Sequence, residues 1–400
     1  MNHQRRILFV SENVTLAQVV RLATLARSLD PERYEVHFAS AGFPELIFGG
    51  TEFIQHHIET LPAEDAARAL ESGKRLYEKS TLLKYIEAER ELIERVQPAL
   101  VVGDFRLSLS TSAEVCHVPS AVLINAYWSP FAVRERFPVP DHPIIKVLGE
   151  RLTEQYFPRA IPQVFQHFAN PLNAARRKHG LSPVGSLLEM LTHGSYVLHP
   201  DDCELTPVAG APSHHRFLGP VLWEPSVAAP QLPLEHPEWP LVYVTLGSSG
   251  KADVLPTVVD ALAGLQVRAV VATADRVTLP ALPANIVQTP FAPGSRLAAR
   301  SSLVITNGGS TTGYQALAAG TPVVGIPSNF DQYLASQAIV TAGAGLEVKA
   351  RLATVTTLRS AVRTALDSDA LRESAAAIGR RFASADSSMR FREWLAETVG

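Results

Sequence analysis

The feature that most constrains this chain is a strand, turn, helix and strand pattern between Leu303 and Pro327. An apolar run, Leu303-Val-Ile-Thr306, precedes a turn of Asn, Gly, Ser and Thr residues that extends to Thr312. A helical segment then ends at Gly320, and a second apolar run ends at Pro327. Such a turn at a helix start gathers free backbone N–H groups, hydroxyls and the positive end of the helix dipole. The pattern predicts an anion site that suits a phosphate group.

Composition narrows the class of protein. A length of 400 residues favours two domains. A hydrophobic content of 46%, a charged content of 19% and a net charge of −3 are typical of a soluble enzyme and give no attraction to nucleic acid. The apolar run after the basic N-terminus has only four residues, Ile7 to Val10, so it predicts a strand rather than a signal peptide. No stretch approaches the roughly 18 apolar residues of a membrane span. We therefore expect a cytoplasmic protein with no nucleic-acid partner and no membrane span.

Strand-like and helix-like runs alternate in two series, which is the pattern of parallel α/β sheets. The first series has expected strands at 6–10, 34–39, 99–105, 121–125, 196–199 and 216–220, with helices at 15–29, 82–96 and 110–115. The second has strands at 241–246, 268–272, 286–288 and 303–306, with helices at 254–265, 331–341, 355–366 and 369–383. The predicted fold class is α/β, with two Rossmann-like, doubly wound domains.

Six prolines between Pro220 and Pro240 indicate a stiff linker. The expected domains are therefore 1–220 and 241–385, joined by a linker at 221–240. A last helix at 386–400 is expected to pack back on the first domain. Residues 127–179 interrupt the alternation with many prolines and aromatic residues. This insertion either lines a cleft for an apolar partner or only caps the sheet.

Two Rossmann-like domains with a phosphate site in the second favour an enzyme that uses a nucleotide sugar. A dehydrogenase is the main competitor, but it requires a Gly-x-Gly-x-x-Gly turn after the first strand. The turn here is Ser11-Glu-Asn-Val-Thr15 and contains no glycine. The nucleotide-sugar hypothesis is therefore preferred.

The second half resembles the GT-B glycosyltransferases of family 1, the UDP-glycosyltransferase-like enzymes that include bacterial antibiotic and macrolide glycosyltransferases. The matching segments are Val244-Thr-Leu-Gly-Ser248, Phe291-Ala-Pro293, Thr306-Asn-Gly-Gly-Ser-Thr-Thr312, Ala316-Leu-Ala-Ala-Gly-Thr-Pro-Val323 and Asp331-Gln332. The first half resembles the acceptor domain of this family more loosely, through residues 6–39 and 99–125. The resemblance implies two domains that face an interdomain cleft.

The resemblance also assigns residues to the sugar donor. The diphosphate would be held by Gly309, Ser310, Thr311 and Thr312, with Ser248 over the phosphates. Asn307 and Gly308 would also belong to the donor site. The backbone at Ala292, beside Phe291, would read the base, and Asp331 and Gln332 would bind the sugar hydroxyls. Helix-terminal amides suit the leaving diphosphate, so no metal is expected. No cofactor is expected besides the UDP- or dTDP-sugar co-substrate.

Three positions depart from the family pattern. Asn307 stands where a histidine usually touches the phosphate, and its amide donates a hydrogen bond but carries no charge. Gln315 stands where an acid usually binds the ribose. Gln18 stands where inverting members place the histidine that deprotonates the acceptor, and glutamine has no useful basicity. Gln18 also has a structural explanation, because Thr15-x-x-Gln18 is a capping box.

Two acids remain as candidate bases. Asp104 ends an apolar strand and matches the aspartate that orients the histidine in the family, although a solvated strand-end acid is also open. If no histidine acts, Asp104 or Glu12 would have to be the base directly. Both are weak bases unless burial raises their pKa.

The leading prediction is an inverting glycosyltransferase that moves a sugar from a UDP- or dTDP-sugar to a small, partly apolar natural product. Trp128 and Phe131 are the candidate acceptor-binding residues. The alternative is a weak or inactive homologue that binds a nucleotide sugar or partners an active transferase. Both a monomer and a homodimer stay open.

Overall fold

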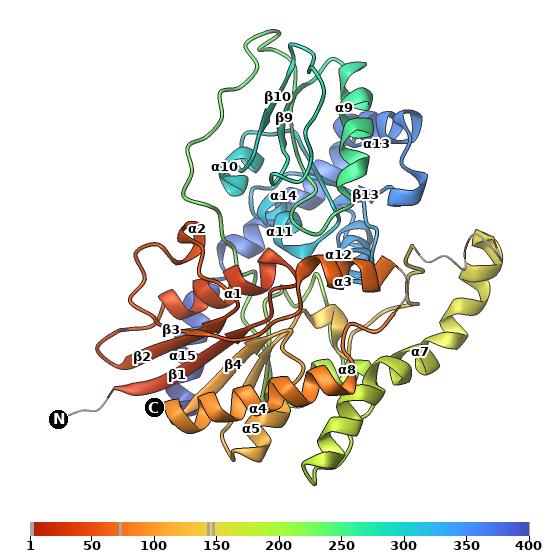
Figure 1. The fold of residues 1–400 in the computed structure, drawn as a ribbon. Coiled ribbons are helices and arrows are strands. Elements are labelled where there is room, and N and C mark those ends of the chain that lie inside the picture. Colours follow the sequence, from red (N-terminus) through yellow and green to blue (C-terminus); the bar gives the residue numbers. More distant parts are fainter. Residues whose placement is uncertain (1–3, 72–73, 142–144, 146–148, 400) are drawn as a thin grey trace. The chain divides into compact units, whose positions relative to one another are not determined.

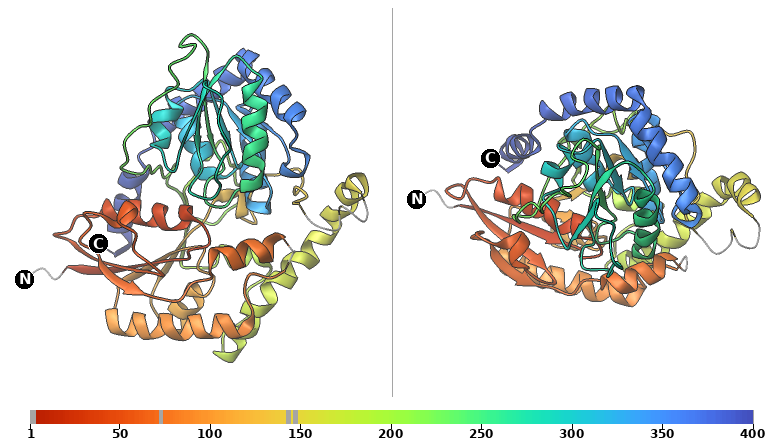
Figure 2. Two further views of the ribbon diagram at one scale, coloured as in Figure 1. Left: turned by 45° about the horizontal axis from the view of Figure 1, so that its top comes forward. Right: turned by 90° about the horizontal axis from the view of Figure 1, so that it is seen from above.

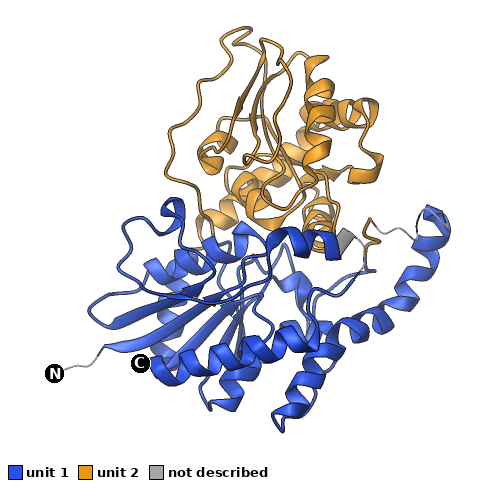
Figure 3. Cartoon of the chain, in the orientation of Figure 1, with its two compact units in different colours: residues 1–137, 143–221, 386–400 blue, residues 138–142, 222–385 orange. Residues whose placement is uncertain are grey.

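The computed structural model describes residues 4–71, 74–141, 145 and 149–399 (Figure 1). The chain divides into two compact units (Figure 3). Unit 1 contains residues 1–137, 143–221 and 386–400, and unit 2 contains residues 138–142 and 222–385. Each unit is built on its own parallel sheet, which confirms the predicted α/β class.

The sheet of unit 1 has seven strands in the order β3-β2-β1-β4-β5-β6-β7. The strands are β1 (Arg5–Ser11), β2 (Tyr34–Ser40), β3 (Ile54–His57), β4 (Leu100–Asp104), β5 (Ser120–Leu123), β6 (Tyr196–His199) and β7 (His215–Phe217). All of the strand pairs are parallel, and Ser11 pairs with Asp104. The carboxyl ends of β1 and β4 therefore lie side by side, at the edge where α/β proteins usually bind ligands.

Helices cover both faces of this sheet. They are α1 (Leu16–Arg27), α2 (Glu45–Phe48), α3 (Ala63–Glu71), α4 (Lys79–Val96), α5 (Leu109–Val115), α7 (Glu150–Lys178), α8 (Leu187–Leu191) and α15 (Ser387–Val399). Figures 1 and 2 show α15, the dark blue helix at the C-terminus, beside the red strands of unit 1. Phe391 of α15 is fully buried with its ring centroid 6.2 Å from that of Phe9 in β1. The C-terminal helix thus contributes to the core of unit 1.

Most of the insertion at 127–179 is one helix of 29 residues, α7, although it contains Pro158, Pro162 and Pro171. Each interior proline removes one backbone hydrogen bond, which is why the sequence did not predict a continuous helix. The helix is held by packing in its second half, where Ala169 and Leu172 join the buried cluster that includes Leu82 and Ile86 of α4. Tertiary contacts outweigh the low helix propensity here.

The sheet of unit 2 has six strands in the order β10-β9-β8-β11-β12-β13. They are β8 (Leu241–Thr245), β9 (Arg268–Ala272), β10 (Ile286–Thr289), β11 (Leu303–Thr306), β12 (Val323–Gly325) and β13 (Gly345–Glu347). The helices are α9 (Leu255–Ala263), α10 (Gly294–Ala298), α11 (Ser310–Ala318), α12 (Phe330–Thr341), α13 (Val355–Asp367) and α14 (Asp369–Ala383). Because Thr306 pairs with Thr245, the loops that follow β11 and β8 leave the sheet next to each other.

Unit 2 also includes the proline-rich residues from Leu222 and the segment 138–142, which the sequence did not assign to it. The hydroxyl of Tyr333 donates to Asp141 Oδ1 at 2.7 Å, and Arg351 forms an ion pair with the same carboxylate. These contacts hold the segment to α12 and to the turn at Arg351. Among the helices that the structure describes, none is long and apolar enough to cross a membrane.

The packing of α15 leads to a stability prediction. Phe391→Ala should lower the free energy of unfolding of unit 1 by about 3–5 kcal/mol, because it leaves a cavity beside Phe9. Urea unfolding followed by far-UV circular dichroism measures this loss. Met389→Ala on the same helix is the control, because Met389 is 42% exposed and should change stability little. Equal effects of the two substitutions would contradict the packing of α15 on β1.

Candidate functional site

The predicted anion site of unit 2 is a tight turn between β11 and α11. Gly308 N–H donates to Thr306 Oγ1 at 2.8 Å, and Gly309 N–H donates to Asn307 Oδ1 at 3.0 Å. Gly308 has φ of +79°, and a Cβ there would lie 3.1 Å from the carbonyl oxygen of Gln332, so only glycine fits well. The amides of Ser310, Thr311 and Thr312 are at the first turn of α11 and have no carbonyl partner within the helix, which is the arrangement that suits an anion.

The loop after β8 packs directly against this turn. Asn307 Nδ2 donates to Ser249 Oγ at 3.3 Å, and a Cβ on Gly250 would lie 2.8 Å from Asn307 Cβ. Arg276 donates to the carbonyl oxygens of Gly247 and Gly250, which holds the loop from its other side. Asn307 therefore ties the glycine-rich turn to the loop that carries Ser248. Its position next to the helix start is compatible with the phosphate contact predicted from the resemblance.

The two glutamines of the predicted donor set have partners inside the protein. Gln332 is 2% exposed, and its Oε1 accepts from the N–H and Oγ of Ser328 at 3.0 Å each, while its Nε2 donates to the Ser249 carbonyl at 3.1 Å. Gln315 is 7% exposed and donates to the Trp223 carbonyl. Both side chains thus support loops of unit 2, whereas the resemblance assigns them to the sugar and the ribose.

The remaining donor candidates lie at the surface or present backbone. Phe291 is 36% exposed, as a ring that stacks on a base would be, and Ala292 beside it is buried. Ser248 and Asp331 are exposed. The structure brings Ser248, the turn at 307–312 and the start of α12 to neighbouring places on unit 2. Their contacts with a donor stay predictions.

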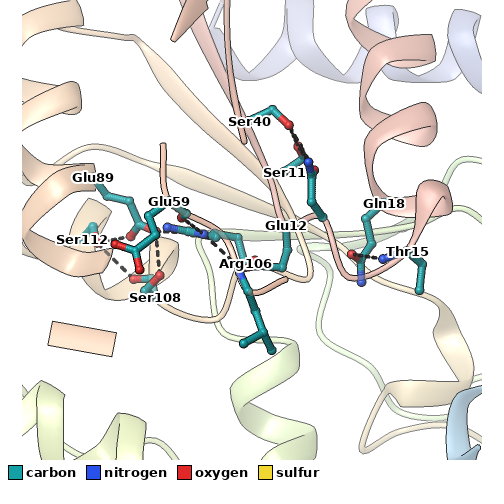
Figure 4. A network of polar contacts seen from close by, with 12 residues as sticks. Ser11, Glu12, Thr15, Gln18, Ser40, Glu59, Glu89, Arg106, Ser108 and Ser112 are labelled. Carbon is teal, nitrogen blue, oxygen red and sulfur yellow. Dashed lines mark hydrogen bonds and ion pairs between the residues drawn. The ribbon is translucent and has the colours of Figure 1, made fainter. Parts of the chain in front are cut away.

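In unit 1, Gln18 forms the predicted capping box (Figure 4). The Thr15 N–H donates to Gln18 Oε1 at 3.1 Å, and the Gln18 residue is 6% exposed. The side chain that stands in the expected histidine position therefore closes the first turn of α1. A glutamine in this arrangement stabilises the helix and takes up no proton.

Asp104 is fully buried, so the hypothesis of a solvated strand-end acid is wrong. Arg21, one turn after Gln18 on α1, donates from Nη2 to Asp104 Oδ1 and from Nε to Oδ2, both at 2.9 Å. Arg21 Nη1 donates to Asn125 Oδ1 at 2.6 Å, and Asn125 Nδ2 donates to Asp201 Oδ1 at 2.8 Å. Burial alone would lower the pKa of Arg21, but the ion pair with Asp104 raises it. A permanent positive charge therefore lies where the family pairs an aspartate with histidine.

Glu12 belongs to a second buried network, drawn in Figure 4. Its Oε2 accepts from Arg106 Nη1 at 3.0 Å and its Oε1 accepts from the Leu61 N–H at 2.7 Å. Arg106 Nε also donates to Glu89 Oε1 at 2.6 Å. Two carboxylates therefore share one guanidinium. Burial raises the pKa of Glu12 above its ordinary value, while Arg106 acts to lower it.

The candidate acceptor aromatics follow β5. Trp128 is 7% exposed, and Phe131 is half-buried with its ring edge against His215 at 5.5 Å between centroids. His199 Nε2 lies 3.2 Å from His215 Nδ1, and its Nδ1 lies 2.8 Å from the Ile124 carbonyl oxygen. Burial lowers the pKa of both imidazoles to about 4, so both are neutral near pH 7. Phe131 thus contacts a neutral histidine pair.

Sequence reasoning missed the partners that fix these side chains. Arg21, Arg106 and Ser249 contact predicted site residues from positions far away in the chain, and no motif marks them. The only local signal is that Arg21 follows Gln18 by three residues and therefore lies on the same face of α1. Within the described residues, no cluster of three or more His, Cys, Asp or Glu side chains has the geometry of a metal site.

The chain is similar in sequence to several known proteins. The family described as "Erythromycin biosynthesis protein CIII-like, C-terminal domain" matches residues 256–390. A PGL/p-HBAD biosynthesis glycosyltransferase of Mycobacterium tuberculosis is 44% identical over 384 residues, which cover 95% of this chain and 89% of the relative. A PGL/p-HBAD biosynthesis rhamnosyltransferase of Mycobacterium bovis is 42% identical, with 95% and 84% covered. An inactive PGL/p-HBAD biosynthesis glycosyltransferase of Mycobacterium bovis is 45% identical, with 65% and 71% covered.

Solved structures agree on the fold. The spinosyn forosaminyltransferase SpnP superposes with a TM-score of 0.71 at 18% identity, with 99% of this chain and 100% of that chain covered. The spinosyn rhamnosyltransferase SpnG complexed with thymidine diphosphate has a TM-score of 0.65 at 18% identity, with 97% and 99% covered. The fold is therefore GT-B. The chain belongs to the glycosyltransferases of family 1, of the bacterial antibiotic type.

The Arg21–Asp104 pair leads to a second stability prediction. Arg21→Met should cost about 3–5 kcal/mol of unfolding free energy, because it leaves Asp104 buried without a counter-charge. The double variant Arg21→Met with Asp104→Leu should recover much of this loss, since an apolar pair has no unpaired charge. Urea unfolding of the three proteins measures both effects. A loss below about 1 kcal/mol for Arg21→Met would contradict the buried ion pair.

Glu12 leads to a pH prediction. Its raised pKa means that the folded protein holds this proton more tightly than the unfolded chain, whose glutamates titrate near ~4.3. The resulting stabilisation is complete below the unfolded pKa and is lost as the pH rises through the folded pKa. The unfolding free energy of the wild type, relative to Glu12→Gln, should therefore fall as the pH rises above the unfolded pKa of ~4.3. Urea unfolding at a series of pH values, with the exposed Glu59→Gln as control, tests it; a constant difference would refute it.

Proposed function

We propose that this glycosyltransferase is an inverting, metal-independent enzyme that transfers a sugar from a UDP- or dTDP-sugar to a partly apolar acceptor. The observation that carries the proposal is the start of α11, where Gly308 and Gly309 leave the amides of Ser310 to Thr312 for a diphosphate. SpnG, which shares the fold, is described with thymidine diphosphate bound, and this supports a nucleoside diphosphate for the present chain.

On the donor side, the proposed reaction breaks the bond between the anomeric carbon and the diphosphate. The negative charge that develops on the leaving oxygen is met by the helix-terminal amides and by the Asn307 amide, which is positioned by Ser249. Fixed backbone dipoles of this kind need no reorganisation when the charge appears. Phe291 offers its exposed ring to the base.

On the acceptor side, the hydroxyl must lose a proton as its oxygen attacks. Gln18 takes up no proton, both oxygens of Asp104 accept from Arg21, and both oxygens of Glu12 accept hydrogen bonds. We therefore propose that no strong base stands at these three positions and that the proton of the acceptor hydroxyl passes to water. Acceptors with an acidic hydroxyl should then react best. The names of the relatives support an acceptor of the PGL/p-HBAD group.

The alternative is a homologue that binds the donor but does not turn it over. Gln18 in the histidine position favours this reading, and a relative 45% identical to the chain is named as inactive. In that case the donor site of unit 2 would still bind a nucleotide. Binding and turnover therefore have to be measured separately.

The test is turnover of UDP- and dTDP-sugars against matched phenol and alkyl alcohol acceptors. We expect the phenols to react at least ~10-fold faster, because their hydroxyls need less help from a base. Gln18→His alone should raise the transfer rate by far less than the roughly 10²–10⁴-fold that a well-placed general base contributes. The reason is that both carboxylate oxygens of Asp104 already accept hydrogen bonds from Arg21, so Asp104 does not orient the new imidazole. The matched control is Gln18→Ala, which removes the cap without adding an imidazole.

Two outcomes would contradict the proposed mechanism, and a third would favour the alternative. A gain of about 100-fold or more for Gln18→His would show that a base at this position works without Asp104. Equal rates for phenols and alcohols would contradict the absence of a strong base. Nucleotide binding without turnover of any acceptor would favour the inactive homologue.

A further inference from the structure

Gln332 lies in the first turn of α12, but its side chain points into unit 2. It is 2% exposed and its amide makes bonds at both ends. Oε1 accepts from the Ser328 N–H and Oγ, and Nε2 donates to the Ser249 carbonyl at 3.1 Å. Its backbone N–H donates to the Asn329 side chain, which caps the helix. Hydrogen bonds therefore hold both the backbone and the side chain of Gln332, and the side-chain amide contacts the segment at Ser328 and the loop at Ser249.

These bonds join the three loops that carry the proposed donor site. Ser249 belongs to the loop after β8, and its Oγ accepts from Asn307 Nδ2 at 3.3 Å. Asn307 Oδ1 in turn accepts from Gly309 N–H in the turn before α11. A continuous chain of hydrogen bonds thus runs from Ser328 through Gln332, Ser249 and Asn307 to the N-cap of α11. The backbone of Gln332 also limits the turn, since its carbonyl lies beside Gly308.

We propose that Gln332 is a positioning residue, which sets the diphosphate site by joining these loops and does not bind the sugar. This inference rests on the proposed function, because it assumes that α11 and its neighbouring loops bind a nucleoside diphosphate. Loss of the Gln332 amide leaves the Ser249 carbonyl and the Ser328 N–H without these partners. The loop after β8 and the glycine-rich turn then lose their fixed spacing, and diphosphate binding weakens whether or not a sugar is attached.

The neighbour Asp331 provides the contrast. It is exposed on the same first turn of α12, and the resemblance assigns it to the sugar hydroxyls. A residue that touches the sugar affects the binding of a nucleotide sugar and leaves the bare nucleoside diphosphate unaffected. A positioning residue affects both ligands by the same factor. The ratio of the two dissociation constants therefore separates the two roles.

The experiment is calorimetry of the whole chain with UDP, UDP-glucose, dTDP and dTDP-glucose. Gln332→Met, which keeps the volume of the side chain, and Gln332→Ala should each weaken both members of the better-bound pair by at least ~10-fold, with an unchanged ratio. Asp331→Ala, the matched control, should weaken only the nucleotide sugar. Thermal unfolding of each variant checks that it is folded, and Gln332→Met serves where Gln332→Ala does not fold.

The outcomes distinguish a failure of the proposed role of Gln332 from a failure of the proposed function. If the wild type binds no nucleotide, the proposed donor site is refuted. If the wild type binds both ligands and Gln332→Met loses affinity only for the nucleotide sugar, Gln332 is a sugar ligand and the inference is overturned. Unchanged binding of both ligands by Gln332→Met overturns it as well.

Discussion

The buried ion pair between Arg21 and Asp104 determines what the strand-end site of unit 1 can do. Both carboxylate oxygens of Asp104 accept from one guanidinium, which also reaches Asn125 and, through it, Asp201. The carboxyl ends of β4 and of the segments after β5 and β6 are thereby tied to α1. The Arg106 guanidinium likewise donates hydrogen bonds to the buried carboxylates of Glu12 and Glu89. Asp104 and Glu12, the two acids that the sequence left as candidate bases, therefore have buried hydrogen-bond partners, and a buried charge without a partner would be costly.

In unit 2, the predicted anion site at the start of α11 is surrounded by neutral groups. The start of α11 supplies backbone amides, and the side chains around it, Asn307, Ser249 and Gln332, hold those amides in place without a charge of their own. Fixed neutral dipoles of this kind can stabilise the negative charge of an anion without reorganising. The two units therefore differ in how well they fit the family pattern. Unit 2 has the glycine-rich turn of the family pattern, whereas unit 1 has the capping glutamine Gln18 at the position where the resemblance places a histidine, with Arg21 paired to Asp104.

Local pattern was enough to predict much of this structure. The strands β1, β8, β9 and β11 contain buried apolar runs, and the turn before α11 carries its own glycine signal. The capping box of Gln18 was predicted because its two residues are three apart. The strand β3 was missed because only one of its four residues, Ile54, is apolar, and α7 was missed because its prolines oppose a helix. The partners of Asp104 and Gln332 could not be predicted, since each contact joins residues 83 positions apart and depends on the finished fold.

The pH dependence of sugar transfer shows whether an imidazole deprotonates the acceptor, and we expect that none does. With a phenolic acceptor and saturating donor, kcat/KM should rise with pH up to the pKa of the acceptor itself, which lies near ~10 for a simple phenol. An enzyme that uses a histidine would level off near the ordinary imidazole pKa of ~6.5. A profile that bends near neutral pH, and loses the bend when a single histidine of unit 1 is replaced, would contradict the account.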